Sequence, residues 1–342
     1  MRAEVITLNE ERNVTLTIYL QETGGEFPNM QKRPAMLILP GGGYQFCSAR
    51  EADPVAAPYL AAGFQVFILR YSVREHCAWP NPLDDYDQAM GLIRANADEW
   101  GIFADQVAVI GFSAGGHLAA AAATMSKNRP DAAILGYAVA GNDVKGCSPT
   151  APDTIGFVDK DTCPCFLFST RDDGVVHILN SIDFMKALAE HNIAFESHIY
   201  AYGPHGCSTC DTSVQHADTA ICSRTPNWVP DSIGWLRDMF GEFGAGGLRP
   251  PVCKKHVNAD HEPFLSLDCT FGRLMANAAS KAILEGLMQQ MQAAGQNAEI
   301  FSGVDLAAVA GRLTMKEVLG FLRVDKAAIA ALDGHLRQIP NN

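Results

Sequence analysis

The first strand-like pattern lies near the start of the chain, where apolar and polar residues alternate. Residues 4–9 (EVITLN) and 14–21 (VTLTIYLQ) both alternate, and a polar segment at 10–13 separates them. Alternation on both sides of a short polar turn predicts an antiparallel β-hairpin. Shorter apolar runs predict further strands at residues 35–40, 64–73, 106–112, 132–139, 163–170 and 195–202.

Segments with helical spacing of apolar residues separate these runs. They lie at residues 53–63, 83–101, 114–125, 180–192 and 230–243. From Ala35 to Phe243 strands and helices therefore alternate along the chain. Such alternation implies a mostly parallel sheet covered by helices on both faces, with the N-terminal hairpin extending one edge. The predicted fold class is α/β.

The pattern changes after a Gly/Pro-rich segment at residues 244–252, which we interpret as a domain boundary. Beyond it, helical spacing recurs at residues 274–295, 306–323 and 325–339, with Asp325 as the expected N-cap of the last helix. No strand pattern of any length follows the boundary. We therefore expect a catalytic domain over residues 1–245 and a helical domain over 251–342, whose helices would mediate any homo-oligomer.

Composition narrows the classes of partner. The chain has 342 residues and a formal net charge of −12, so its surface repels the phosphate groups of nucleic acids and anionic membranes. It contains no run of about 18 apolar residues, the length that a transmembrane helix needs. The N-terminus lacks the features of a secretory signal, and the 10 cysteines suit reduced thiols in a cytoplasm better than a disulfide framework.

One corner of the chain carries candidate chemistry. Residues 111–115 read Gly-Phe-Ser-Ala-Gly, between the predicted strand 106–112 and a predicted helix that starts at Ala114. A G-x-S-x-G segment in this setting is typical of a nucleophile elbow, where side chains at the glycine positions would collide with the strand or helix. The alternative is a phosphate-binding helix start, but the segment lacks a P-loop lysine and the spacing of a dinucleotide motif. We predict that Ser113 is a nucleophile.

A nucleophilic serine needs a base and an acid, which follow an elbow of this kind in the order Asp or Glu, then His. Asp172 and Asp173 follow the predicted strand 163–170, and His205 follows the strand 195–202. Asp173 stands three residues before Val176, a spacing that suits a turn directing the carboxylate at a histidine. We predict Asp173 as the acid and His205 as the base, with Asp172 as a turn residue.

Acyl transfer also needs N–H donors for the oxyanion that forms during attack. The backbone amide of Ala114, directly after the nucleophile, is one candidate. The loop LPGGGY, residues 39–44, follows the first parallel strand and offers Gly42 and Gly43 as the others. The alternative interpretation of three glycines is a flexible turn, which their position after this strand disfavours.

A second motif, HGCSTCDTSVQH, raises the possibility of a zinc site formed by His205, Cys207, Cys210 and His216. A structural zinc site usually draws on a further pair of ligands, and the sequence has no matching C-x-x-C. We therefore predict no metal and treat Cys207 and Cys210 as free thiols.

Several segments together resemble the acetyl esterase and acetylxylan esterase group of α/β hydrolases. They are PGGGYQFCSAREADPVA, LRYSV, GFSAGGHLAA, DDGVV and GPHG, in this order between Ala35 and Phe243. The resemblance implies an α/β-hydrolase fold that needs no cofactor, and it implies the same roles for the residues predicted above. Pro40 stands where many relatives have histidine.

The resemblance implies a serine carboxylesterase that removes acetyl groups from xylan-derived oligosaccharides or similar sugars. A general short-chain carboxylesterase is the alternative within hydrolases. A non-catalytic binding protein with this fold is the alternative from another class, since folds host unrelated functions. Aromatic residues near the strand ends are candidates to stack on a sugar ring, namely Tyr44, Tyr71, Trp79 and Phe46. The alternative for each of them is packing in the core, which is the commoner role of an aromatic side chain.

Overall fold

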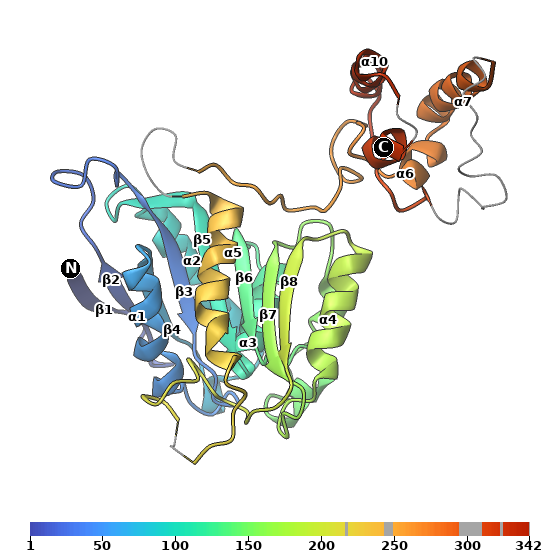
Figure 1. The fold of residues 1–342 in the computed structure, drawn as a ribbon. Helices are drawn as coiled ribbons and strands as arrows, with labels where there is room; N and C mark the ends of the chain where they lie inside the picture. The colour runs from blue at the N-terminus through green and yellow to red at the C-terminus, as the bar shows by residue number, and fades with distance from the viewer. Residues whose placement is uncertain (216–217, 243–248, 294–309, 322–323, 342) are drawn as a thin grey trace. The chain divides into compact units, whose positions relative to one another are not determined.

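A computed structural model describes residues 1–215, 218–242, 249–293, 310–321 and 324–341, and it divides the chain into two compact units, Met1–Lys255 and His256–Asn342 (Figure 1). The predicted boundary at 244–252 lies partly outside the described residues. The first unit extends beyond residue 245, because the backbone amide of Val252 donates to the Asp238 carbonyl and that of Ala194 donates to the Lys255 carbonyl, both over 2.9 Å.

Eight strands form one sheet in the first unit, in the order β1-β2-β4-β3-β5-β6-β7-β8. Strands β1 and β2 pair antiparallel, β2 pairs antiparallel with β4, and all later pairs are parallel. The predicted hairpin therefore extends one edge of a mostly parallel sheet, as expected. The strands are β1 Arg2–Asn9, β2 Val14–Leu20, β3 Arg33–Leu39, β4 Gln65–Arg70, β5 Ile102–Phe112, β6 Ala132–Gly136, β7 Cys165–Thr170 and β8 Phe195–Tyr200.

Helices cover both faces of this sheet, and alternate strand residues enter two separate cores. On β5, Val107 and Val109 contribute to the core beneath α2, α3 and α4, whereas Ala108 and Ile110 contribute to the core beneath α1 and α5. The helices are α1 Asp53–Ala61, α2 Asn81–Ala95, α3 Ala114–Met125, α4 Leu179–Glu190 and α5 Trp228–Phe240. The two-sided burial explains why these strands read as continuous apolar runs.

The second unit is helical and has its own apolar core, which includes Leu265, Leu274, Leu319 and Leu336. In its described residues the helices are α6 Phe271–Ala276, α7 Ala278–Ala293, α9 Met315–Phe321 and α10 Lys326–Leu336.

Two details of the predicted helices can be compared with the structure. The predicted N-cap is confirmed, because the Asp325 carboxylate accepts from the amides of Ala327 and Ala328. The helix predicted at 274–295 is interrupted at Asn277, whose side chain accepts from the amides of Ala279 and Ser280 and so starts α7. Residues 306–309 and 322–323 of another predicted helix lie outside the described residues. In the described part of the chain, none of the helices combines the length and apolarity needed to cross a bilayer.

Candidate active site

The turn between β5 and α3 holds Ser113 in a backbone conformation with φ 52° and ψ −117°, which non-glycine residues rarely adopt. The neighbouring glycines permit this turn. A Cβ atom on Gly115 would lie 2.1 Å from the Leu39 carbonyl oxygen, and one on Gly111 would lie 2.1 Å from the Gly115 carbonyl oxygen. The strand, the turn and the helix therefore pack too closely for any side chain at these two positions.

The structure brings the three predicted residues of the triad together. The distance from Ser113 Oγ to His205 Nε2 is 2.9 Å, and that from His205 Nδ1 to Asp173 Oδ2 is 2.7 Å. Ser113 follows β5, Asp173 follows β7 and His205 follows β8, so all three lie at the carboxyl edge of the parallel sheet. The imidazole thus lies between a hydroxyl and a carboxylate in hydrogen-bonding contact with both.

Asp173 is held as an ionised acceptor. Its Oδ1 atom accepts from the amides of Val175 and Val176 over 2.8 and 2.9 Å, while Oδ2 contacts His205. Burial alone would raise the pKa of Asp173, but the contacts with His205 and the two amides outweigh it and lower that pKa. Asp172 instead accepts from the amide of Gly203 over 2.9 Å, which is the turn role predicted for it.

The glycine loop after β3 lies against the nucleophile. A Cβ atom on Gly41 would lie 3.1 Å from Ser113 Cβ, and Gly42 and Gly43 have φ values of 135° and 59°. In the described part of the chain, the amides of Gly42 and Gly43 have no acceptor. Ala114 is the first residue of α3, where an amide has no partner within the helix. Gly41, directly before Gly42 and Gly43, thus lies against Ser113, and in the described part of the chain none of the three predicted donor amides has an acceptor.

Two buried tyrosines hold this loop in place through hydrogen bonds. Tyr71 donates to the Pro40 carbonyl over 2.6 Å, and the Tyr44 hydroxyl lies 2.7 Å from His117 Nδ1. His117 Nε2 contacts the Pro152 carbonyl over 2.8 Å, and since a carbonyl only accepts, Nε2 carries the proton and Nδ1 accepts from Tyr44. Burial lowers the pKa of His117 to about 4, which keeps this imidazole neutral.

The prediction that Tyr44 and Tyr71 stack on a sugar is wrong. Their side chains are 0% and 1% exposed, so neither ring presents a face to a ligand. Trp79 is partly buried and packs on the His117 ring, with centroids 5.5 Å apart. Phe46 follows the glycine loop and is 55% exposed. Sequence position alone did not distinguish supporting aromatics from accessible ones.

Sequence reasoning also missed two buried polar residues beside the triad, Glu51 and Tyr137. The Glu51 carboxylate accepts from the amide of Gly41 and from the Tyr137 hydroxyl, and the Tyr137 ring packs edge-on against His205. No periodic pattern singles out either residue, because only the tertiary fold brings residue 51 close to residue 137. In the sequence Glu51 lies two residues before α1, a position that does not by itself indicate burial.

The cysteine motif gives no metal site among the residues that the structure describes, which contain no group of three His, Cys, Asp or Glu side chains placed to hold one. Cys207 and Cys210 are buried, with their sulfur atoms 2.8 Å apart. His205 contacts Ser113 and Asp173 instead, and His216 lies outside the described residues.

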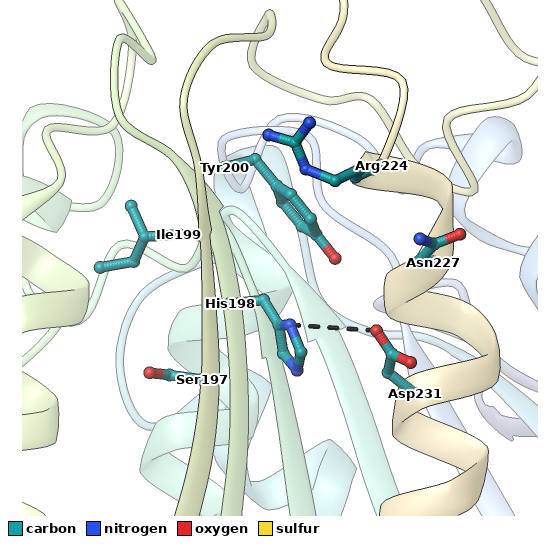
Figure 2. Close-up of a pocket in the computed structure, with 7 residues that line it drawn as sticks. All are labelled: Ser197, His198, Ile199, Tyr200, Arg224, Asn227 and Asp231. Atoms are coloured by element: carbon teal, nitrogen blue, oxygen red, sulfur yellow. Dashed lines mark ion pairs between the residues drawn. The ribbon is translucent and has the colours of Figure 1, made fainter.

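A separate groove lies between β8 and α5 (Figure 2). His198 and Asp231 face each other across it, with Nδ1 and Oδ2 3.9 Å apart. None of the predicted site residues lines this groove. Its lining consists of Ser197, His198, Ile199, Tyr200, Arg224, Asn227 and Asp231.

Comparison with known proteins identifies the fold. The crystal structure of MGS-M1, an alpha/beta hydrolase enzyme from a Medee basin deep-sea metagenome library, is 43% identical, with a TM-score of 0.66. The match covers 69% of this chain and 97% of that protein. The chain belongs to the α/β-hydrolase family. A model of the BD-FAE family also matches residues 16–146 of this α/β hydrolase.

Two curated relatives of this α/β hydrolase have names related to xylan. Endo-1,4-beta-xylanase B of Butyrivibrio fibrisolvens is 30% identical over 211 residues, which are 53% of this chain and 33% of that protein. The acetylxylan esterase of Xylanibacter ruminicola is 28% identical over 197 residues, which are 50% of this chain and 40% of that protein. This α/β hydrolase thus spans between a third and two-fifths of the length of these relatives.

Proposed function

We propose that this protein is a serine carboxylesterase that removes acetyl groups from xylan-derived oligosaccharides or similar acetylated sugars. The hydrogen-bonded series Ser113, His205 and Asp173 is the observation that carries the proposal. Similarity to an acetylxylan esterase and to a xylanase supports the acetylated sugar as substrate.

Acylation begins at the 2.9 Å contact between Ser113 Oγ and His205 Nε2. The imidazole takes the hydroxyl proton as Oγ attacks the acetyl carbonyl carbon, which forms a tetrahedral intermediate. Asp173 fixes the imidazole with its proton on Nδ1 and stabilises the imidazolium that forms. His205 then donates its new proton to the sugar oxygen, and the C–O bond breaks to release the alcohol.

The amides of Ala114, Gly42 and Gly43 are the donors for the negative oxygen of that intermediate. Donors that already face the developing charge need no reorganisation, and loss of one typically costs about 10²–10³-fold in rate. Deacylation repeats the sequence with water as the nucleophile, activated by His205, and releases acetate and free Ser113. The exposed Phe46 and the partly buried Trp79 are the aromatic residues that remain available to contact the sugar.

Replacement of the nucleophile tests this proposal. Ser113→Ala should lower kcat on p-nitrophenyl acetate by about 10⁴-fold or more, because the acyl-enzyme cannot form. It should also abolish labelling by a fluorophosphonate probe while the melting temperature changes little. Ser223→Ala, at an exposed serine, is the matched control and should retain both activity and labelling. Full turnover by Ser113→Ala would eliminate the proposed site.

An ester panel tests the substrate class. Wild-type protein should hydrolyse acetyl esters faster than octanoyl esters, and it should release acetate from acetylated xylo-oligosaccharides. Preference for octanoate would contradict the acetyl assignment. Rapid hydrolysis of p-nitrophenyl acetate without release of acetate from any sugar would favour a general short-chain carboxylesterase.

A further inference from the structure

A second carboxylate lies beside the candidate active site. Glu51 ends the short helical turn Ala49–Glu51 and is 4% exposed. Its Oε2 atom accepts from the amide of Gly41 over 2.7 Å, and its Oε1 atom accepts from the Tyr137 hydroxyl over 2.6 Å. Gly41 adjoins Gly42 and Gly43, so this carboxylate anchors the loop that carries the predicted oxyanion donors.

Tyr137 extends this connection to the histidine loop. Its hydroxyl accepts from the amide of Ser208 over 2.9 Å, which leaves its single hydrogen to donate to Glu51. Its ring packs edge-on against His205, with centroids 5.1 Å apart and an interplanar angle of 69°. Tyr137 therefore contacts the imidazole through its ring and supports the backbone of the same loop through its hydroxyl.

The backbone around Glu51 adds two further links to that loop. The Arg50 guanidinium donates to the Gly206 carbonyl, and Ser208 Oγ donates to the Arg50 carbonyl over 2.5 Å. The turn at residues 49–51 is thus bonded on one side to the glycine loop and on the other to the residues directly after His205. The two loops come from opposite ends of the unit's sequence, and this turn connects them.

The hydrogen bonds indicate the charge of Glu51. Both oxygens accept from donors whose hydrogens have no other use, as expected for an ionised carboxylate. The pKa of Glu51 is raised overall, because burial outweighs the bonds from Tyr137 and Gly41 and the nearby His205, which lower it. The titratable or charged groups around His205 include Asp173 from the loop after β7, Tyr137 from the loop after β6, Cys207 from its own loop, and Arg50 and Glu51 from the turn at 49–51.

We infer that Glu51 and Tyr137 are positioning residues for the proposed acyl-transfer site. Glu51 fixes the oxyanion loop through Gly41 and the His205 ring through Tyr137, and its negative charge assists Asp173 in stabilising the imidazolium form of His205. The inference rests on the proposed function for its kinetic part. Its electrostatic part concerns the resting protein and can be measured without any substrate.

Glu51→Gln separates these effects from simple structural support. The variant should lower kcat by about 10- to 100-fold with little change in KM, since it loosens the geometry of donors and base. Removal of a nearby negative charge destabilises the imidazolium form of His205. The acidic limb of the kcat/KM profile should therefore move to lower pH, and an NMR titration of His205 should move in the same direction.

Two variants serve as controls. Tyr137→Phe keeps the Glu51 charge but removes the hydroxyl link, so kcat should fall by about 10-fold while the pKa of His205 moves less than in Glu51→Gln. Glu190→Gln removes the same charge from an exposed position on α4 and should change neither kcat nor the pKa of His205.

The outcomes distinguish this inference from the proposed function. Unchanged kcat and an unchanged pKa of His205 in Glu51→Gln would overturn it. A lower kcat without a shift in that pKa would overturn the electrostatic assignment, since structural loosening alone explains such a result. If wild-type protein hydrolyses no ester, the proposed function fails, and the NMR shift still tests the effect of Glu51 on His205. If Glu51→Gln does not fold, Tyr137→Phe tests the link, and an unchanged kcat there would overturn it.

Discussion

The two units of the chain bury polar side chains in different ways. The first unit buries charged residues, including Arg33, Glu51, Asp85, Asp87 and Asp173. In the described part of the second unit, the buried polar residues are hydroxyl-bearing ones only, Ser266, Thr270 and Ser280. The first unit therefore holds fixed charges in its interior, whereas the second consists of apolar packing with hydroxyl groups at its turns.

The partners of these groups show what each unit uses them for. In the first unit, Asp85 accepts from Arg12 and from the amide of Ser72 after β4, which orders a loop at the carboxyl edge of the sheet. In the second unit, Thr270 caps α6, and Ser280 donates to the Leu274 carbonyl over 2.6 Å. Buried charge is costly unless it is paired, so its concentration in the first unit indicates a region shaped for chemistry.

Two matched glycine substitutions should give the largest difference between the units. Gly115→Ala places a Cβ atom 2.1 Å from the Leu39 carbonyl oxygen and 2.5 Å from that of Pro40, both rigid backbone atoms. We expect a loss of about 3 kcal/mol or more in the free energy of unfolding, together with loss of esterase activity. Gly286→Ala in α7 meets nothing within 4 Å and should stabilise the second unit by about 0.5–1 kcal/mol.

Denaturant unfolding followed by circular dichroism measures both effects. Gly234→Ala in α5 is a control within the first unit, because its new Cβ also meets nothing within 4 Å. It should be neutral or slightly stabilising and should keep full activity. An active and stable Gly115→Ala would show that the elbow is not packed as described.

The pH dependence that His117 gives to the stability of the first unit should be an effect of intermediate size. The pKa of His117 is about 4 in the folded protein, below the ordinary value of 6.5. Between these two pH values the unfolded chain binds a proton at His117 and the folded protein does not. Stability from the neutral imidazole is present above pH 6.5 and is lost as pH falls toward 4. The loss should reach on the order of 3 kcal/mol below both values.

His117→Gln isolates this contribution, because glutamine keeps a donor and an acceptor but does not titrate. Wild type should exceed the variant in free energy of unfolding at pH 7, and this difference should shrink as pH approaches 4. Groups such as Glu51 and Asp131 titrate in both proteins, so they cancel from the difference. A difference that stays constant with pH, or an NMR titration showing His117 protonated near pH 6.5, would refute the neutral buried histidine.

The residues that local patterns predict well are those that the backbone itself requires. Gly111 and Gly115 are dictated by the turn at Ser113. Asp173 lies at the start of the turn expected from its spacing to Val176, and the amides of Val175 and Val176 donate to its carboxylate. The alternating strands and helices give the sheet, because two-sided burial leaves a continuous apolar run. These features depend on neighbours within a few residues, so they are legible in one sequence.

Features that depend on distant partners were missed or assigned wrongly. Tyr44 and Tyr71 follow strand ends, where an accessible aromatic was expected, but they turn inward to His117 and Pro40. Glu51 and Tyr137 are 86 residues apart and meet only when the sheet has formed. The boundary after residue 245 was placed from Gly and Pro content, whereas hydrogen bonds of residues 252–255 extend the first unit.

Removal of the second unit should have the smallest effect on catalysis. A chain ending at Lys255 keeps the Lys255 carbonyl that accepts from Ala194, and it retains the triad and all three predicted oxyanion donors. The apolar core of the second unit is formed by its own side chains, and both cores of the sheet are formed by residues of the first unit. We expect kcat on p-nitrophenyl acetate to change by less than about twofold, a difference well under 1 kcal/mol.

Size-exclusion chromatography of both chains tests whether the helices mediate a homo-oligomer. A smaller subunit number in the shortened chain supports this, and an unchanged one contradicts it. A shortened chain that folds but loses activity would show that the second unit contributes to the site, and the contrast between the two units would then be wrong.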